Sequence, residues 1–198
     1  MNDLYNGIFD AGCIKFGEFK LKSGILSPVY VDFRGLVSMP KLLAAIGKKL
    51  AERAKEIGCD RIAGIPYAGI PLGVAASIAG NIPMLYLRRE AKDYGTKKLI
   101  EGEFSTGDRI LVIDDIITDG ASKIEAIAPL KEVGLEVTDV LVILDREQGG
   151  GRILEQAGYR LHSLIRLSEV LDALVSVGKV DSEMRTKVTE FIARHQFG

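Results

Sequence analysis

The sequence predicts an α/β fold with a mostly parallel central sheet flanked by helices. Two observations lead to this prediction. Short apolar runs, such as RILVID at 109–114, alternate along the chain with segments whose apolar residues have helical spacing. These runs are apolar at consecutive positions, as expected of strands buried on both faces, and glycine-containing turns follow them. Because ligands of such folds bind beyond the carboxyl ends of the strands, these turns are the candidate functional segments.

The N-terminal elements follow from apolar spacing and from turn residues. Apolar residues at helical spacing predict a helix over about 2–12. Alternation of apolar and polar residues predicts a strand over 29–35. Pro40 is predicted to begin a long helix that reaches about Ile57 and is stopped by Gly58.

From residue 61 onward strands and helices alternate, and one polar, charged segment at 88–106 interrupts the alternation. Strands are predicted at 61–66, 84–87, 109–114, 137–145 and 159–165. Helices are predicted at 72–80, at 123–134, after 151, near 168–177 and at 181–195.

Composition limits the class of protein. The 198 residues fit a single domain over 1–198, and 47% hydrophobic with 27% charged residues excludes extensive disorder. The net charge of -1 gives no global attraction to nucleic acid or to an anionic membrane, so neither partner is expected. The two cysteines form no Cys-x-x-Cys pair, and the sequence suggests neither a signal peptide nor a membrane span. A soluble, cytoplasmic protein is expected.

The strongest chemical signal is ILVIDDIITDGAS at 110–122. A buried strand is predicted to deliver Asp114 and Asp115 to its carboxyl end, and a short turn with one glycine precedes a helix. Backbone N–H groups of such a turn form a cradle for a phosphate, to which the hydroxyls of Thr118 and Ser122 can donate. Two adjacent carboxylates suit a neutral polyol such as ribose, or a magnesium ion that bridges a sugar and a pyrophosphate.

Two other interpretations of this segment compete. Asp119 or Thr118 could simply cap the next helix, with the acidic pair in a solvated turn. A phosphoacceptor receiver domain also places paired acids at strand ends. That domain needs its acids on the first strand with a full domain following, and too little chain follows Asp115. Two acids, a threonine and a glycine after a buried strand therefore favour a ligand site.

Positive charge is concentrated in the segment that interrupts the alternation. Five cations fall within eleven residues: Arg88, Arg89, Lys92, Lys97 and Lys98. A charged run is most often a solvated loop, but long loops in compact α/β folds are frequently lids. Cations that close onto a diphosphate would oppose the charge that develops on it when its bond to a sugar breaks. Closure would also exclude water.

The acids, threonine, glycine and serine of 110–122 resemble the ribose-phosphate loop of the type I phosphoribosyltransferases. Three further segments are similar to motifs of the orotate phosphoribosyltransferases: FKLKSGILSPVYVD at 19–32, RREAKDYGTKKLIEG at 88–102 and LDREQGG at 144–150. The resemblance runs over nearly the whole chain and is closest to the transferase half of the bifunctional UMP synthases.

This resemblance implies a type I phosphoribosyltransferase fold with a small hood, made of about residues 1–35 and C-terminal elements. It implies transfer of the 5-phosphoribosyl group from phosphoribosyl pyrophosphate to orotate, giving orotidine 5′-monophosphate and pyrophosphate, in pyrimidine (UMP) biosynthesis. Magnesium (Mg2+) is the implied cofactor. In the family the charged loop acts across a dimer interface, so a homodimer is implied.

The site residues are carried over by resemblance. Catalytic roles fall to Arg88, Arg89, Asp115 and Lys92, the last being the implied catalytic lysine. Orotate would be bound by Lys22, Tyr30, Val31, Thr118 and Arg146. Phosphoribosyl pyrophosphate would be bound by Lys22, Tyr67, Ala68, Arg88, Arg89, Lys92, Tyr94, Asp114, Asp115, Ile116, Ile117, Thr118, Asp119, Gly120, Ala121 and Ser122. Magnesium would be held mainly by the diphosphate and the ribose, with Asp114 and Asp115 contacting it through water.

The choice of base depends on Arg146. Orotate is a planar carboxylate, which suits the fork of a guanidinium group, whereas an ion pair with Asp145 or Glu147 is the alternative role. Two competing functions stay open. A purine phosphoribosyltransferase would lack this arginine and the LKSG segment. A non-catalytic, RNA-binding regulator on the same fold should carry a basic face.

Overall fold

The computed structural model describes residues 2–20, 24–88 and 99–198. The strands of its main sheet are β3 (Arg61–Gly64), β4 (Met84–Leu87), β5 (Ile100–Glu101), β6 (Arg109–Ile117), β7 (Glu136–Asp145) and β8 (Arg160–Arg166). Within the described ranges this six-stranded sheet has the order β5-β4-β3-β6-β7-β8. The pairs among the last five strands are parallel, and β5 runs antiparallel to β4. The predicted α/β fold with a mostly parallel sheet is confirmed.

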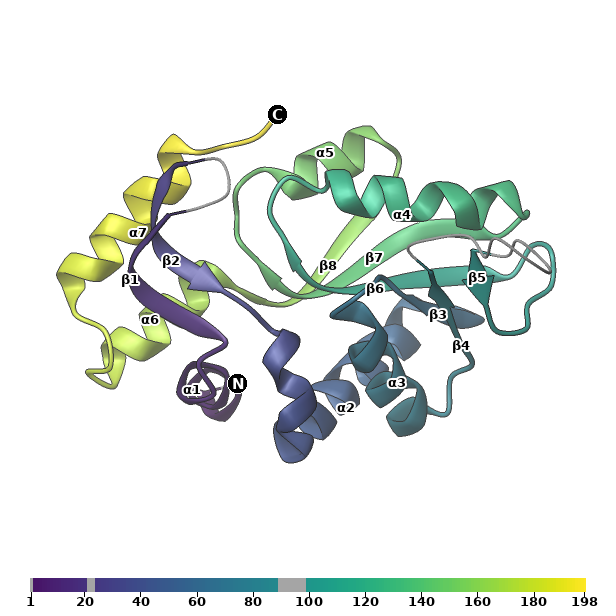
Figure 1. The fold of residues 1–198 in the computed structure, drawn as a ribbon, viewed down its shortest axis with the longest axis horizontal. Coiled ribbons are helices and arrows are strands. Elements are labelled where there is room, and N and C mark those ends of the chain that lie inside the picture. The colour runs from purple at the N-terminus through teal and green to yellow at the C-terminus, as the bar shows by residue number, and fades with distance from the viewer. Residues whose placement is uncertain (1, 21–23, 89–98) are drawn as a thin grey trace.

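Helices cover both faces of the sheet. α2 (Pro40–Ile57) and α3 (Gly69–Gly80) lie on one face, and α4 (Ala121–Glu132) and α5 (Gly150–Gln156) lie on the other (Figure 1). Successive side chains of β6 enter different hydrophobic clusters, so that residue 113 packs with α2 and α3 while residue 112 packs with α4 and α5. Burial on both faces explains why this strand is apolar over four consecutive residues.

The predicted limits of α2 are confirmed. Pro40 stands at the start of the helix, where its missing N–H costs no hydrogen bond. Gly58 ends the helix with φ +81, and its N–H donates to Ala54 O. Ile46, Leu50 and Ala54 form a stripe that is completely buried against the sheet.

A second, two-stranded sheet lies beside the main one (Figure 1). β1 (Ile14–Lys20) pairs antiparallel with β2 (Leu26–Val31), and α7 (Ser182–Arg194) packs against β2. α1 (Asn2–Asp10) contacts α6 (Leu167–Ser176). Buried side chains of these elements belong to the same cluster as those of α2 and α3, so both parts share one core. That the elements act as a hood stays a prediction.

The N-terminal strands differ from expectation. The strand predicted at 29–35 is β2, which begins and ends earlier. It ends because the Asp32 carboxylate accepts a hydrogen bond from Arg34 N at 3.0 Å, and this turn leads into a 3-10 helix, η1 (Arg34–Ser38). β1 was not predicted, because Gly17 and a shift in its register with β2 interrupt its alternation.

Over residues 2–20, 24–88 and 99–198, every helix is too short or too polar to pass through a bilayer.

α3 begins directly against the end of β6. Gly69 packs so closely that a Cβ atom added there would collide with Ile113 O and lie 3.3 Å from Asp114 Oδ1. Gly64 on β3 is equally confined, since its Cβ would lie 2.7 Å from Gly69 O. These two glycines allow the N-terminus of α3 to lie beside Asp114.

We therefore expect Gly69→Ala to lower the free energy of unfolding by about 1–3 kcal/mol, because the colliding atom belongs to backbone that cannot move aside. Denaturant unfolding measures this loss. Gly35→Ala is the matched control, since a Cβ at Gly35 meets no atom within 4 Å. Equal unfolding midpoints for the two variants would contradict the packing described.

Candidate active site

Asp114 and Asp115 lie near the carboxyl end of β6, but within the strand rather than in the turn after it. β7 continues beside β6, and the pairing of Ile117 with Asp145 keeps the chain extended past the two acids. Asp114 is buried, with 6% of its surface exposed, and Asp115 is half-buried. The solvated turn that the competing interpretation required for the acidic pair is therefore not found.

A buried lysine neutralises the first acid. Lys123 Nζ lies 2.7 Å from Asp114 Oδ2, and both side chains are more than nine-tenths buried. Asp114 Oδ1 accepts a hydrogen bond from Asp115 N at 2.9 Å, and Lys123 Nζ donates to Ser122 Oγ at 3.3 Å. Sequence reasoning missed Lys123, although it lies four residues before the buried Ile127 and so on the inner face of α4.

The predicted phosphate turn, 118–122, leads from β6 into α4. Gly120 has φ +82, in the left-handed region that favours glycine, and its carbonyl accepts from the first N–H groups of the helix. Asp119 Oδ1 accepts a hydrogen bond from Ala121 N at 3.0 Å, which closes a local turn, but the N-cap residue of α4 is Gly120 and no side chain caps the helix. Ala121 and Ser122 are exposed at the start of α4. The alternative role of Asp119 or Thr118 as the helix cap is therefore not found, and the turn stays the candidate phosphate site.

Two of the predicted donor-binding residues belong to the core. Ile117 is completely buried in the cluster beneath α4 and α5, and Ile116 packs partly buried against the opposite cluster. Ile117 O accepts a hydrogen bond from Arg146 N at 3.1 Å. The Ile117 side chain therefore holds the strand end in place and cannot reach a ligand.

Arg146 follows β7, and its side chain is buried with donors unused. It is 9% exposed, and its Nε and Nη2 atoms have no hydrogen-bond partner among the described residues. Burial lowers the pKa of Arg146. An unpaired buried guanidinium is costly, and an anionic ligand would remove that cost.

The alternative role for Arg146, an ion pair with a neighbouring acid, is not found. Asp145 Oδ1 accepts a hydrogen bond from Glu147 N at 2.7 Å. The Glu147 carboxylate accepts hydrogen bonds from Ser168 N at 2.7 Å and from Ser168 Oγ at 3.0 Å. Both neighbouring acids therefore bind other groups.

C-terminal residues hold the turn that carries Arg146. Gln148 Nε2 donates to His195 O at 3.0 Å, and Phe197 N donates to Gln148 O at 2.8 Å. A Cβ atom at Gly149 would collide with Phe197 O, so the two segments are in close contact. α7 and the residues after it thus connect β2 with this turn.

Other predicted site residues lie on neighbouring elements. Tyr67 and Ala68 precede α3, whose first residue packs beside Asp114. Tyr30 and Val31 end β2, where Tyr30 is partly exposed.

The predicted lid segment, 88–106, is described at its two ends, Arg88 and 99–106. Arg88 Nη1 lies 3.3 Å from Glu101 Oε1, which ties the first arginine of the charged segment to β5. The other residues singled out in this loop and in the turn after β1 lie outside the described residues: Lys22, Arg89, Lys92, Tyr94, Lys97 and Lys98.

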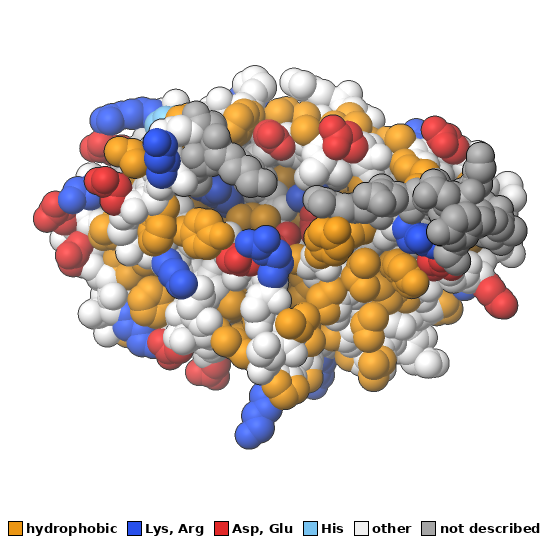
Figure 2. Space-filling view, in the orientation of Figure 1, with side chains coloured by type: hydrophobic (Ala, Val, Ile, Leu, Met, Phe, Trp, Pro, Cys, Tyr) orange, Lys and Arg blue, Asp and Glu red, His pale blue; other side chains and the backbone are white. Residues whose placement is uncertain are grey.

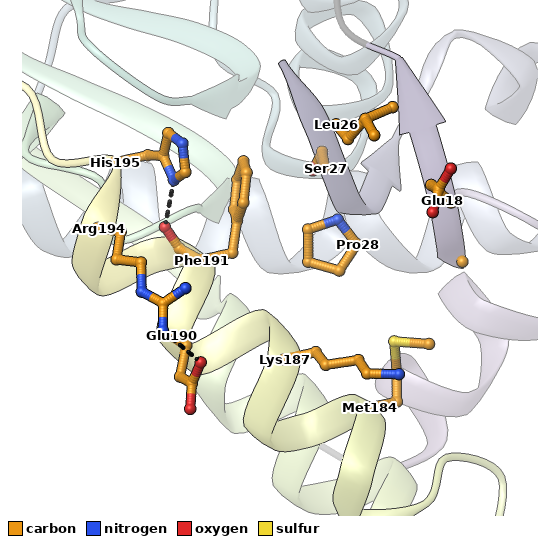
Figure 3. Close-up of a pocket in the computed structure, with 11 residues that line it drawn as sticks. Glu18, Leu26, Ser27, Pro28, Met184, Lys187, Glu190, Phe191, Arg194 and His195 are labelled. Carbon is orange, nitrogen blue, oxygen red and sulfur yellow. Dashed lines mark hydrogen bonds and ion pairs between the residues drawn. The ribbon is translucent and has the colours of Figure 1, made fainter.

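A cavity of about 610 Å³ lies between β2 and α7 (Figure 3). Leu26 and Pro28 line it from β2, and Lys187 and Phe191 line it from α7. No described residue predicted to bind the donor or orotate lines this cavity. Its volume alone does not make it the candidate site.

The surroundings of Asp115 favour its protonated, uncharged form. Burial, followed by the charge of Asp114, raises the pKa of Asp115 from 3.8 to about 7, while Lys123 acts in the opposite direction. The described residues contain no group of three His, Cys, Asp or Glu side chains that could hold a metal ion. The pair is thus neither a protein-only metal site nor a fully ionised dyad near neutral pH.

Asp115→Asn is expected to stabilise the fold more at about pH 8 than at about pH 5. The unfolded chain releases the Asp115 proton near pH 4, whereas the folded protein keeps it until about pH 7. Rising pH between these values therefore lowers the free energy of unfolding of the wild type relative to the neutral variant. Denaturant unfolding at the two pH values measures this difference.

Asp108→Asn is the control for this experiment. Asp108 pairs with Arg61, and that contact lowers the pKa of Asp108, so it is ionised at both pH values. Its effect on stability should be the same at both. An advantage of Asp115→Asn that is constant or shrinks with pH would contradict the raised pKa.

Comparison with known proteins finds relatives over most of the chain. The uridine 5′-monophosphate synthase of Bos taurus is 43% identical over 199 residues, which cover 100% of this chain and 42% of that protein. The orotate phosphoribosyltransferase of Pyrococcus abyssi is 40% identical over 173 residues, which cover 86% of this chain and 95% of that protein. The chain thus spans less than half of the longer relative. No family model matches it.

Solved structures agree with these relatives. The UMP synthase of Leishmania donovani has a TM-score of 0.89 and 36% identity, covering 98% of this chain and 42% of that one. The orotate phosphoribosyltransferase of Mycobacterium tuberculosis, in complex with 5-phospho-alpha-D-ribosyl 1-diphosphate (PRPP), has a TM-score of 0.71 and 26% identity, covering 85% and 97%. By its fold and its identity to a relative that it covers almost completely, the chain belongs to the orotate phosphoribosyltransferase family.

Proposed function

We propose that the chain transfers the 5-phosphoribosyl group of PRPP to orotate, giving orotidine 5′-monophosphate and pyrophosphate in pyrimidine biosynthesis. One observation carries the proposal: the acidic strand end and a buried, unpaired Arg146 lie side by side, because Arg146 N donates to Ile117 O. Family membership supports it, as does the PRPP complex of the Mycobacterium tuberculosis enzyme.

The acids and the turn after β6 suit the ribose 5-phosphate part of PRPP. Carboxylate oxygens of Asp114 and Asp115 can accept hydrogen bonds from the ribose hydroxyls. The turn offers the hydroxyls of Thr118 and Ser122, and the positive end of the α4 dipole favours a phosphate there.

Arg146 suits the carboxylate of orotate. Nε and Nη2 form one side of the guanidinium fork, and two parallel hydrogen bonds from them match the two oxygens of a carboxylate. Tyr30 and Val31 would lie along the base, with Lys22 and Thr118, as the family resemblance implies. A purine lacks a carboxylate and would leave Arg146 buried and unpaired, which disfavours a purine transferase. The net charge of -1 gives no support to an RNA-binding regulator.

The reaction needs cations near the leaving group. A ring nitrogen of orotate donates an electron pair to C1′ and gives up its proton, while the C1′–oxygen bond breaks. The electron pair of the broken bond leaves with pyrophosphate, and the proton is released to the pyrophosphate or to water. Positive side chains that meet the diphosphate only in the closed state stabilise the negative charge that develops on the leaving pyrophosphate. By resemblance these are Arg88, Arg89 and Lys92, with Tyr94 beside them. Closing the lid would turn Arg88 toward the diphosphate and so would break its contact with Glu101.

Magnesium fits this site only as an ion carried by the substrate. The oxygens of Asp114 already bind Lys123 and Asp115 N, and the described residues offer no further acids in a cluster. Contact through water with Asp114 and Asp115 is compatible with this arrangement. When bound, the ion would neutralise charge on the diphosphate.

An apolar surface supports the proposed homodimer. The outward side chains of α3 are apolar, with Val74 45% and Ile78 79% exposed, and Tyr67 and Tyr86 are also exposed. Figure 2 shows hydrophobic side chains gathered over this helix. A surface helix that is apolar on its outer side is usually covered by a partner. Free Cys13 and Cys59 fit the proposed cytoplasmic setting.

Arg146→Gln should raise the KM for orotate by about a hundredfold, because two charge-assisted hydrogen bonds to its carboxylate are lost. Steady-state assays with orotate, uracil and hypoxanthine in parallel measure both this loss and the choice of base. Arg194→Gln, an exposed arginine on α7, is the control. Turnover of another base in preference to orotate would refute the proposed function.

Lys92→Ala should lower turnover by at least about a hundredfold, the scale for loss of one transition-state donor. Mixing it with Asp115→Asn tests whether the lid acts across a dimer. A mixed dimer would contain one site with both intact groups, so activity should recover. Absence of recovery would contradict the crossed arrangement, and a near-normal Lys92→Ala rate would contradict the role of the lid.

A further inference from the structure

Lys123 is the one buried lysine among residues 2–20, 24–88 and 99–198, with 5% of its surface exposed. Burying a charged pair rarely stabilises a fold more than packed apolar residues of similar size would. Its spacing from Ile127 and Leu130 places it where the inner face of α4 is otherwise apolar. A leucine or methionine would fit the pattern of this face, so the charge calls for a functional reason.

We propose that Lys123 is a positioning residue for the ribosyl donor. It fixes the Asp114 carboxylate and the Ser122 hydroxyl in the arrangement that binds the ribose and the 5′-phosphate together. This inference rests on the proposed function and adds a residue to its donor site.

The contact with Asp114 sets the direction of that carboxylate. Lys123 Nζ lies 2.7 Å from Oδ2, and Asp115 N donates to Oδ1 at 2.9 Å. Each oxygen is thereby held by one donor and keeps a second acceptor position for a ribose hydroxyl. Without the ammonium group, two adjacent carboxylates would repel each other in a site of low dielectric constant.

The contact with Ser122 sets the direction of a hydroxyl. The Lys123 ammonium has no acceptor, so in its 3.3 Å contact with Ser122 Oγ the lysine must be the donor. A hydroxyl that accepts from the ammonium turns its own hydrogen away and can donate it to a phosphate oxygen. One buried cation thus couples the acidic strand end to the phosphate turn.

The test measures separately how Lys123 variants change the KM for PRPP and the KM for orotate. Lys123→Met should raise the KM for PRPP, and its Kd by calorimetry with magnesium, by about tenfold or more. The KM for orotate should change by less than about twofold, because Arg146 is untouched. Lys131→Met, on the exposed side of the same helix, is the matched control and should behave as the wild type.

Lys123→Gln keeps a hydrogen-bond donor without the charge, so it carries the test if the methionine variant fails to fold. It should bind PRPP more weakly than the wild type. Wild-type affinity for PRPP in both folded variants would overturn the inference, as would an equal rise of both KM values. A wild-type protein that binds no PRPP would overturn the proposed function and this inference with it.

Discussion

The pairing of β6 with β7 as far as their carboxyl ends is the constraint on which the rest of the structure depends. It sets Ile117 opposite Asp145, and the next residue, Arg146, then donates its N–H to Ile117 O. A shift of one residue would exchange the faces of β6 and move Asp114 away from Lys123. Apolar clusters on both sides of the sheet prevent such a shift, so the same packing that stabilises the core aligns the candidate site.

The site concentrates charge that the protein itself only partly compensates. Asp114 has a full partner in Lys123, the half-buried Asp115 beside it has a raised pKa, and Arg146 has unused donors. Buried charges and unpaired donors lower the stability of a fold when the local dielectric constant is low. Residues that bind ligands commonly have such charges and donors. Ligand hydroxyls beside the acids and a ligand carboxylate beside Arg146 would offset this loss of stability. The proposed substrates, PRPP and orotate, together carry these groups.

The sequence predicted the fold well, and for physical reasons. Strands covered on both faces must be apolar throughout, and Pro40 and Gly58 are strong limits for a helix. The predicted end of β6 was wrong. Asp114 and Asp115 are polar and resemble the start of a turn, whereas pairing with β7 keeps them extended.

Features that depend on tertiary contacts could not be predicted in this way. Lysine is usually a surface residue, so the burial of Lys123 becomes visible only when α4 is placed on the sheet. The absence of a partner for Arg146 likewise depends on Glu147 binding Ser168 instead. Ile117 lies within a motif that contacts substrate in the family, but its side chain belongs to the core.

A crystal structure with orotate and PRPP bound would test the central claim most directly. We expect the orotate carboxylate within hydrogen-bond distance of Arg146 Nε and Nη2, with the ribose hydroxyls on Asp114 and Asp115. Orotate bound in the cavity between β2 and α7, with Arg146 still unpaired, would contradict it.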